Sequence, residues 1–229
     1  MKTISIHQPE YLPWIGFFDR IAKSDIFVIL DDVGYQKNGF MNRNKIKNPQ
    51  GWQWITVPVQ GRSPNKKVNE VLINNATNWA DVHMRAIYLN YCKAPYYKNY
   101  STFFEETFKK KWDNLGDLDI YLIENVLKFL GIKTKVERSS NVAVEGENTE
   151  RLVNICKHFK TTTYLSGPGG KNYMDLEKFR EENIKVVFQE FNHPEYAQMF
   201  KDRGFIACLS IIDLLFNCGP NSLKIISEK

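Results

Sequence analysis

Two short apolar segments near the start of the chain flank a segment with helical periodicity. Residues 3–7 (TISIH) and 25–30 (DIFVIL) are rich in β-branched and apolar residues, which favours strands. Between them, residues 12–23 space their apolar side chains as a helix does. The second strand is continuously apolar, as expected of a strand that is covered on both faces in a parallel sheet. This pattern predicts a β-α-β unit.

A second β-α-β unit is predicted towards the end of the chain. TTTYLSG at residues 161–167 and IKVVFQEF at residues 184–191 have the pattern of strands, and a glycine-bearing turn and a helix lie between them. Before this unit, residues 134–141 predict a strand, and Asn148 or Thr149 could cap a helix that runs through residues 151–159. A final helix is predicted over residues 205–216. We therefore expect an α/β fold of Rossmann-like type, with a mainly parallel sheet flanked by helices.

The middle of the chain differs from both units. Residues 34–48 are polar and turn-rich and predict a long loop, and the alternation in residues 51–59 (GWQWITVPV) predicts another strand. Helices are then predicted over residues 79–91, 102–112 and 117–130. We expect a single α/β domain over residues 1–229, in which about residues 79–130 form a helical insertion, layer or subdomain.

The composition of the 229-residue chain is that of an ordinary globular protein, with 43% hydrophobic and 25% charged residues. No apolar run approaches the about 18 residues that a membrane-spanning helix needs, and TISI near the N-terminus is unlike a signal peptide. We therefore expect a cytoplasmic protein without stable membrane insertion. The four cysteines are widely spaced in apolar surroundings and form no C-x-x-C motif, so we interpret them as buried thiols and predict no metal site.

The net charge of +5 comes mainly from one segment of the chain. Residues 33–69 contain no acidic residue and seven basic ones, namely Lys37, Arg43, Lys45, Lys47, Arg62, Lys66 and Lys67. Such a segment attracts anions and has three interpretations: a solvated basic face, a site for a phosphate-bearing small molecule, or a nucleic-acid surface. Because no RNA- or DNA-binding motif is recognisable, we expect no nucleic-acid partner.

Polar residues stand at the carboxyl ends of the first two predicted strands, where open α/β sheets bind their ligands. His7, followed by Gln8, could act as a general acid or base or donate to a phosphate, or it could be a hydrogen-bonded structural histidine. Asp31 and Asp32 end the second strand, and in an extended strand their side chains would point to opposite faces. One of them could orient His7, bind a sugar hydroxyl or hold Mg²⁺, or it could cap a turn.

Two further segments suit an anionic or sugar ligand. Residues 42–45 (NRNK) combine a guanidinium, an ammonium and two amides, although asparagine-rich turns are also common. Residues 166–171 (SGPGGK) lie between a predicted strand and a predicted helix, where backbone N–H groups could cradle an anion or simply form a turn. Beyond this turn, Tyr173 could stack or form a hydrogen bond.

The remaining histidines and cysteines receive different assignments. His193 follows the last predicted strand, again at a carboxyl end, and could converge on His7 across the sheet. His83 and His158 fall on predicted helices and are assigned surface or packing roles. Cys156 lies two residues from His158, but positions two apart on a helix point in different directions, which disfavours a catalytic cysteine.

The segments IHQPEYLPWIGFFDRIAKSD, LDDV, NRNKIK, GWQWITVPV, TYLSGPGG and LSIIDLLFNCG together resemble the WbqC-like protein family of bacteria, nearly from end to end of the chain. The resemblance implies a role in the biosynthesis of O-antigen, lipopolysaccharide or a related surface glycan. It marks a motif set without assigning roles: His7, Gln8, Tyr11, Asp31, Asp32, Asn42, Arg43, Asn44, Ser166, Gly167, Gly169, Gly170, Tyr173, His193, Pro194, Ser210 and Asp213.

The opening strand, loop, helix and strand are also similar to nucleotidylyltransferase-type and pantothenate-synthetase-type Rossmann-like folds. Those enzymes bind ATP at the end of their first strand and carry a paired H-x-G-H signature. Here HQPEYLPW stands in its place. Use of ATP is therefore not implied by this similarity.

Our leading hypothesis is a transferase that moves an acyl or aminoacyl group to the amine of a nucleotide-linked amino sugar. The alternatives are a glycosyltransferase acting on a nucleotide sugar and a non-catalytic nucleotide-sugar-binding or scaffold protein. The sequence assigns no cofactor with certainty; Mg²⁺, or an acyl donor bound to coenzyme A or to a carrier protein, would fit this hypothesis. The candidate catalytic residues are His7, His193, Asp31 and Asp32. The candidate residues for phosphate and substrate are Gln8, Tyr11, Trp14, Asn42, Arg43, Asn44, Lys45, Ser166, Gly167, Gly169, Gly170, Lys171 and Tyr173.

Overall fold

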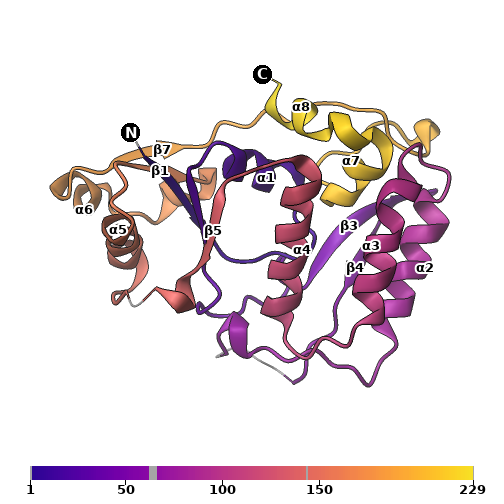
Figure 1. Ribbon diagram of the computed structural model, residues 1–229, viewed down its shortest axis with the longest axis horizontal. Coiled ribbons are helices and arrows are strands. Elements are labelled where there is room, and N and C mark those ends of the chain that lie inside the picture. Colours follow the sequence, from indigo (N-terminus) through magenta and orange to yellow (C-terminus); the bar gives the residue numbers. More distant parts are fainter. Residues whose placement is uncertain (1, 62–65, 143, 229) are drawn as a thin grey trace.

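A five-stranded, wholly parallel sheet organises the protein (Figure 1). The computed structural model describes residues 2–61, 66–142 and 144–228. The strand order is β5-β2-β1-β6-β7. The strands are β1 (Thr3–His7), β2 (Ile26–Ile29), β5 (Lys135–Arg138), β6 (Thr163–Ser166) and β7 (Lys185–Phe188). This arrangement, with helices on both faces, confirms the predicted α/β, Rossmann-like fold with a mainly parallel sheet.

Alternate residues of β2 cover both faces of the sheet. Phe27 and Ile29 belong to one core cluster, together with residues of α1 (Ile15–Ala22), α4 (Leu115–Leu130) and α7 (Ile211–Cys218). Ile26 and Val28 belong to a second cluster. It contains residues of α5 (Asn148–His158) and Phe179 of α6 (Leu176–Glu181). Figure 1 shows α5 and α6 on one side of the sheet and α4 and α7 on the other. The continuous apolar run of β2 is therefore explained by burial on both faces.

The strand order reverses beside β1. From β1 the chain crosses through α1 to β2 on one side, and it later returns through α5 to β6 on the other side. The two crossover helices pack in different core clusters, on opposite faces of the sheet. The carboxyl ends of β1 and β6 therefore flank a topological switch point, which is where such sheets leave a crevice.

Helices fill the middle of the chain as predicted, with shifted starts. α2 (Trp79–Tyr91) has the predicted bounds, α3 (Tyr97–Lys109) begins before residue 102, and α4 begins at Leu115. α3 therefore includes residues 97–101, which lie outside the predicted helix, and Pro95 lies just before its N-cap residue Tyr96. At the start of α4, the Asn114 side chain caps the helix by accepting a hydrogen bond from the backbone N–H of Asp117.

The final helix was predicted too early in the chain. α7 begins at Ile211, where Ser210 provides the cap, and α8 (Ser222–Ser227) follows after a Gly219-Pro220 break. Residues 205–209 are outside regular helix. The apolar character of residues 209–216 marked burial correctly, but it did not mark the cap, and the cap determines where the helix begins.

The expected loop over residues 34–48 is wrong in its last part. Residues Arg43–Asn48 form β3, which pairs antiparallel with β4 (Gly51–Thr56) in a separate hairpin. The sequence of β3 is RNKIKN, in which Ile46 is the one β-branched residue and no residue is aromatic, so it has little of the composition typical of strands. Asn44, Lys47 and Asn48 are instead buried against the rest of the protein, and the Asn44 amide donates to the carbonyls of Tyr11 and Leu12.

The cysteines are free thiols in different environments. Cys156 and Cys218 are buried and Cys92 is partly buried, whereas Cys208 is exposed, so the prediction of a buried thiol is wrong for Cys208. Its backbone N–H donates to His193 Nε2, which holds Cys208 in a surface loop with a positive φ of 56°. Within residues 2–61, 66–142 and 144–228, no helix is long and apolar enough to cross a membrane.

Candidate functional site

A cavity of about 410 Å³ lies at the carboxyl ends of β1 and β6. This volume falls within the range of small-molecule sites, about 300–1,000 Å³, and the position is the switch point of the sheet. Eight of the residues predicted from the sequence line it, namely His7, Gln8, Trp14, Ser166, Gly167, Gly169, Gly170 and Tyr173. The lining also contains Glu10, Arg20 and Gln189, which were not predicted.

Arg20 is a buried cation without a counterion in direct contact among the described residues. Helix α1 is buried all round from Ile15 to Ile21, so the Arg20 side chain is only 5% exposed although it lines the cavity. Among the described residues, no carboxylate lies within 4 Å of its guanidinium, and its Nε has no hydrogen-bond partner. The neighbouring Asp19 is used elsewhere, because it pairs with Lys23 at 2.7 Å and accepts a hydrogen bond from Gln189.

Burial lowers the pKa of Arg20, which shows that its charged form is disfavoured where it lies. A buried charge is stabilised only when it is paired and hydrogen-bonded. A guanidinium that opens into a cavity therefore favours an anionic ligand, since its N–H groups form charge-assisted and often bidentate hydrogen bonds with phosphate or carboxylate.

His7 offers this cavity a neutral ring nitrogen. Its Nδ1 lies 2.9 Å from the Gln8 carbonyl oxygen, which can only accept, so Nδ1 carries the proton and Nε2 is unprotonated. Burial, together with the positive charge of Arg20, holds the pKa of His7 well below its usual value. His7 is therefore a neutral acceptor at physiological pH rather than a cation.

Glu10 has the titration behaviour that proton transfer near neutral pH requires. Its side chain lines the cavity, its Oε1 is 4.0 Å from His7 Nδ1, and its Oε2 has no hydrogen-bond partner among the described residues. Burial raises the pKa of Glu10 to about 7, against an opposing effect of Arg20. A general acid or base is most effective when its pKa is close to the working pH.

The glycine-bearing turn after β6 closes the other side of the cavity. A methyl group on Gly167 would collide with Nη1 of Arg20, and one on Gly170 would collide with the Ser166 hydroxyl, whereas Gly169 has open space around it. Glycine at 167 therefore allows the backbone to approach the guanidinium closely. Pro168–Asn172 form a single 3₁₀ turn, and Tyr173 follows at the exposed rim.

The hairpin residues that were predicted to bind phosphate do not line this cavity. Asn42 donates to the carbonyl of Val57, and Asn44 donates to those of Tyr11 and Leu12. Arg43 donates to the carbonyls of Asn38 and Gly39, and Lys45 lies over the rings of Trp52 and Trp54. Lys171 is also absent from the lining, and its Nζ lies 5.2 Å from the ring centroid of Phe188.

Tyr11 is a buried packing residue in this structure. Its hydroxyl donates to His83 Nδ1 at 2.8 Å, because His83 Nε2 donates to the Thr56 carbonyl. This buried contact matches the packing role that was assigned to His83, and His158 is exposed.

Asp31 and Asp32 form a hydrogen-bonded cluster beyond the ends of β2 and β5. Their side chains were expected to point to opposite faces, but both accept from the hydroxyl of Ser139. The expectation is wrong because β2 ends at Ile29 and the backbone turns before the two acids. Asp31 also accepts from Ser140, and Asp32 pairs with Arg151. Neither lines the cavity.

His193 has both ring nitrogens engaged. Its Nδ1 donates to the Pro194 carbonyl, and its Nε2 accepts from the backbone N–H of Cys208. Its ring stacks on Trp14, with the centroids 6.2 Å apart, and Trp14 lines the cavity. The structure thus places His193 behind an aromatic wall of the cavity, as a support for Trp14.

Sequence reasoning missed Arg20, Glu10 and Gln189. The signal for Arg20 was present, because the adjacent charges of Asp19 and Arg20 interrupt a short helix whose other positions are almost all apolar. A charged pair in a helix buried all round indicates a polar function. Among the described residues, no group of three or more His, Cys, Asp or Glu side chains is placed to hold a metal ion.

Comparisons with known proteins assign the chain to a family. A family model described as the WbqC-like protein family matches residues 8–225. An uncharacterized protein, Rv1507c of Mycobacterium tuberculosis, is 38% identical over 225 residues, which are 97% of this chain and 96% of that protein. No solved structure matches the chain significantly.

Proposed function

This chain belongs to the WbqC-like protein family, and from that premise we propose that it is a transferase of bacterial surface-polysaccharide biosynthesis that acts on a nucleotide-linked amino sugar. In this proposal, the cavity between β1 and β6 holds the sugar nucleotide, and an acyl or aminoacyl group is transferred to the sugar amine. The observation that carries it is the buried, unpaired guanidinium of Arg20 at the switch point of a Rossmann-like sheet.

The diphosphate of a sugar nucleotide supplies the anion that Arg20 lacks. A phosphate oxygen pair matches the fork of guanidinium N–H groups. The turn after β6 adds backbone N–H groups at the same end of the cavity, where Gly167 and Gly170 let the main chain approach. At the rim, the rings of Trp14 and Tyr173 provide surfaces for the base or the sugar.

The groups beside Arg20 suit removal of a proton from an amine. In the proposed step, the amine nitrogen attacks the carbonyl carbon of a thioester donor, so that a C–N bond forms and the C–S bond breaks. The Glu10 carboxylate takes the proton that the nitrogen loses, and the departing thiolate is protonated by solvent. His7 Nε2 accepts a hydrogen bond from the substrate and orients it. The donor is of the thioester class, carried by coenzyme A or by a carrier protein.

The experiment is a thermal-shift screen followed by a turnover assay. The screen uses UDP-, dTDP-, GDP- and CMP-linked amino sugars, coenzyme A and ATP, each with and without Mg²⁺. We expect one class of sugar nucleotide to raise the unfolding midpoint, because ligands that bind only the folded state stabilise it. With an acyl thioester present, that ligand should gain one acyl group, detected by mass spectrometry.

Two results would overturn the proposal. If every sugar nucleotide left the unfolding midpoint unchanged at millimolar concentration, the cavity would not be a sugar-nucleotide site. If one of them bound but no thioester gave a product, the chain would be a binding or scaffold protein rather than a transferase.

A further inference from the structure

The outer face of the β3–β4 hairpin carries exposed aromatic side chains. Phe40, Trp52 and Trp54 are 43%, 44% and 36% exposed. They are neighbours, since the ring centroids of Phe40 and Trp54 are 5.9 Å apart and those of Trp52 and Trp54 are 5.6 Å apart. The opposite face of the hairpin is buried through Ile46 and Ile55, and the hairpin contacts α2 and α7 (Figure 1).

Basic side chains lie among these rings. The Arg43 guanidinium is 4.3 Å from the ring centroid of Trp54, and Lys45 Nζ is 4.5 Å from that of Trp52. Lys37 is exposed in the preceding loop. We name Lys37, Phe40, Arg43, Lys45, Trp52 and Trp54 the aromatic–basic face. Residues 33–69, which contain it, include no acidic residue.

The aromatic–basic face has a composition that fits a membrane surface. Tryptophan is enriched at the level of lipid headgroups, where one part of the indole is in apolar surroundings and the N–H is wet. Lysine and arginine beside it are attracted to anionic headgroups. Single exposed apolar residues are normal on a soluble protein, but a cluster of three exposed aromatic rings with two cations against them is not.

The geometry disfavours a nucleic-acid surface. Proteins that bind single strands stack bases on open aromatic faces. Here Lys45 lies over the rings of both tryptophans, Arg43 lies over Trp54, and the two indoles meet at an interplanar angle of 86°. The ring faces are thus partly covered by the protein's own cations, which leaves less open aromatic surface for stacked bases.

We propose that the aromatic–basic face binds the surface of a membrane containing anionic lipids, so that the protein acts while peripherally attached. Binding combines partial insertion of Phe40, Trp52 and Trp54 with attraction of Lys37, Arg43 and Lys45 to negatively charged headgroups. This inference concerns a face that shares no residue with the lining of the cavity between β1 and β6.

The test is co-sedimentation of the full chain with vesicles. Vesicles of phosphatidylglycerol and phosphatidylcholine should bind the protein at low salt, and vesicles of phosphatidylcholine alone should bind it far less. The double variant Lys37→Glu, Lys45→Glu should lower the partition coefficient at least about 25-fold, because each basic residue near such a surface contributes about fivefold and the new carboxylates are repelled by the anionic headgroups. The double variant Trp52→Ser, Trp54→Ser should lower it about tenfold and remove the quenching of tryptophan fluorescence by brominated lipids.

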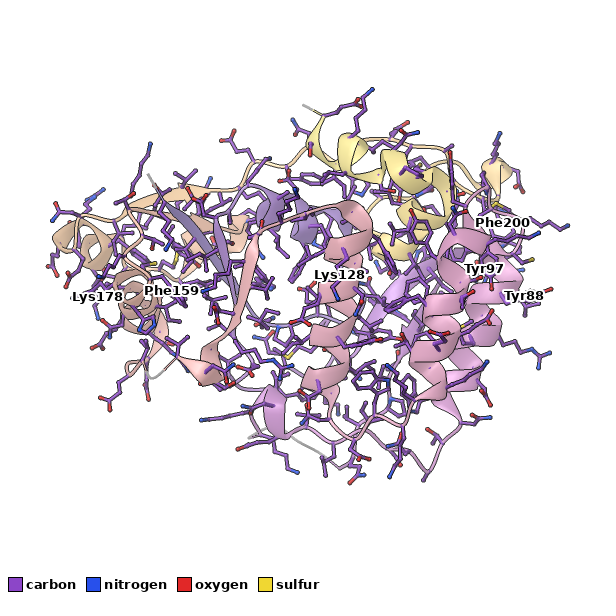
Figure 2. All side chains as sticks on the ribbon, in the orientation of Figure 1. Tyr88, Tyr97, Lys128, Phe159, Lys178 and Phe200 are labelled. Carbon is purple, nitrogen blue, oxygen red and sulfur yellow. The ribbon has the colours of Figure 1, made fainter. Side chains whose placement is uncertain are left out.

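Matched variants separate the face from general charge and apolarity. Lys128→Glu with Lys178→Glu makes the same change of net charge on α4 and α6, and Tyr88→Ser with Leu89→Ser removes exposed apolar side chains from α2 (Figure 2). Both control pairs should bind vesicles as the parent chain does. Equal binding to both kinds of vesicle, no binding to either, or tighter binding to single-stranded RNA than to anionic vesicles would each overturn the proposal.

Discussion

Replacement of Arg20 by methionine is expected to stabilise the protein and to abolish ligand binding. Methionine keeps most of the volume of the side chain but removes a cation that is 5% exposed and has no ion pair within 4 Å among the described residues. We expect the free energy of unfolding to rise by roughly 1–3 kcal/mol, because an uncompensated buried charge is removed. The affinity for a sugar nucleotide should fall about a hundredfold, since a desolvated charged hydrogen-bond partner is lost. Urea unfolding without ligand and calorimetric titration measure the two effects.

Three variants serve as controls for this prediction. Arg180→Met removes an exposed arginine that pairs with Glu177, and it should change neither quantity. Gly167→Ala keeps the Arg20 charge, but the added methyl group collides with Arg20 Nη1 and displaces the guanidinium, so this variant should weaken ligand binding. Gly169→Ala adds its methyl group to open space and should leave ligand binding unchanged. Loss of stability in Arg20→Met with unchanged affinity would show that Arg20 is a structural cation.

Ligand affinity is expected to fall as the pH rises above neutrality, and Glu10 is expected to cause the fall. Burial raises the pKa of Glu10 to about 7. Above that pH its carboxylate becomes charged beside the ligand and competes for Arg20, so the affinity for a sugar nucleotide should fall several-fold as the pH passes through about 7 and then level off, because the ligand still binds the charged Glu10 that takes the amine proton. The diphosphate diester of a sugar nucleotide keeps its own charge over this range. Titrations from about pH 7 to about pH 9 measure the slope, which Glu10→Gln should abolish.

The same carboxyl group has a predictable effect on stability without ligand. Between about pH 4.5 and about pH 7 the folded chain keeps a proton on Glu10 that the unfolded chain has released, so the Glu10 contribution to stability decreases as the pH rises. His7 has the opposite sign, because its pKa is lowered in the folded chain. The comparison of Glu10→Gln with the parent isolates the first effect.

We expect the stability advantage of Glu10→Gln to grow by about 2–3 kcal/mol from pH 4.5 to pH 8. Arg20, His7 and the buried carboxyl of Asp119 are present in both proteins, so their contributions cancel to first order. A difference between the two proteins that does not change with pH, or an equal pH slope of ligand affinity in both, would contradict the assignment of Glu10.

The sheet could be predicted from the sequence because its strands carry a strong physical signal. The four residues of β2 are buried on both faces, and that burial requires the continuous apolar run that the sequence shows. β3 carries no such signal. Its polar residues are held by tertiary contacts, such as the hydrogen bonds from the Asn44 amide to the carbonyls of Tyr11 and Leu12. Local β-propensity contains no information about such contacts with distant residues.

Only part of the candidate site could be predicted, because the sequence reports strand ends but does not report how distant elements pack. His7 and the turn after β6 could be located because ligand sites of open α/β sheets follow the carboxyl ends of strands. Arg43 and Lys45 were grouped with them on charge alone, and the fold places them on a separate hairpin. Arg20 was missed because a charge on a helix is usually solvated, and only the packing around α1 shows that this one is buried.

The central claim is that Arg20 and the turn after β6 hold the phosphates of a sugar nucleotide. A crystal structure of the protein with the sugar nucleotide that gives the largest thermal shift tests it most directly. We predict phosphate oxygens within hydrogen-bond distance of the Arg20 guanidinium and of backbone N–H groups between Ser166 and Gly170, with the sugar amine next to Glu10. Phosphates bound against Arg43 and Lys45, with Arg20 still unpaired, would contradict it.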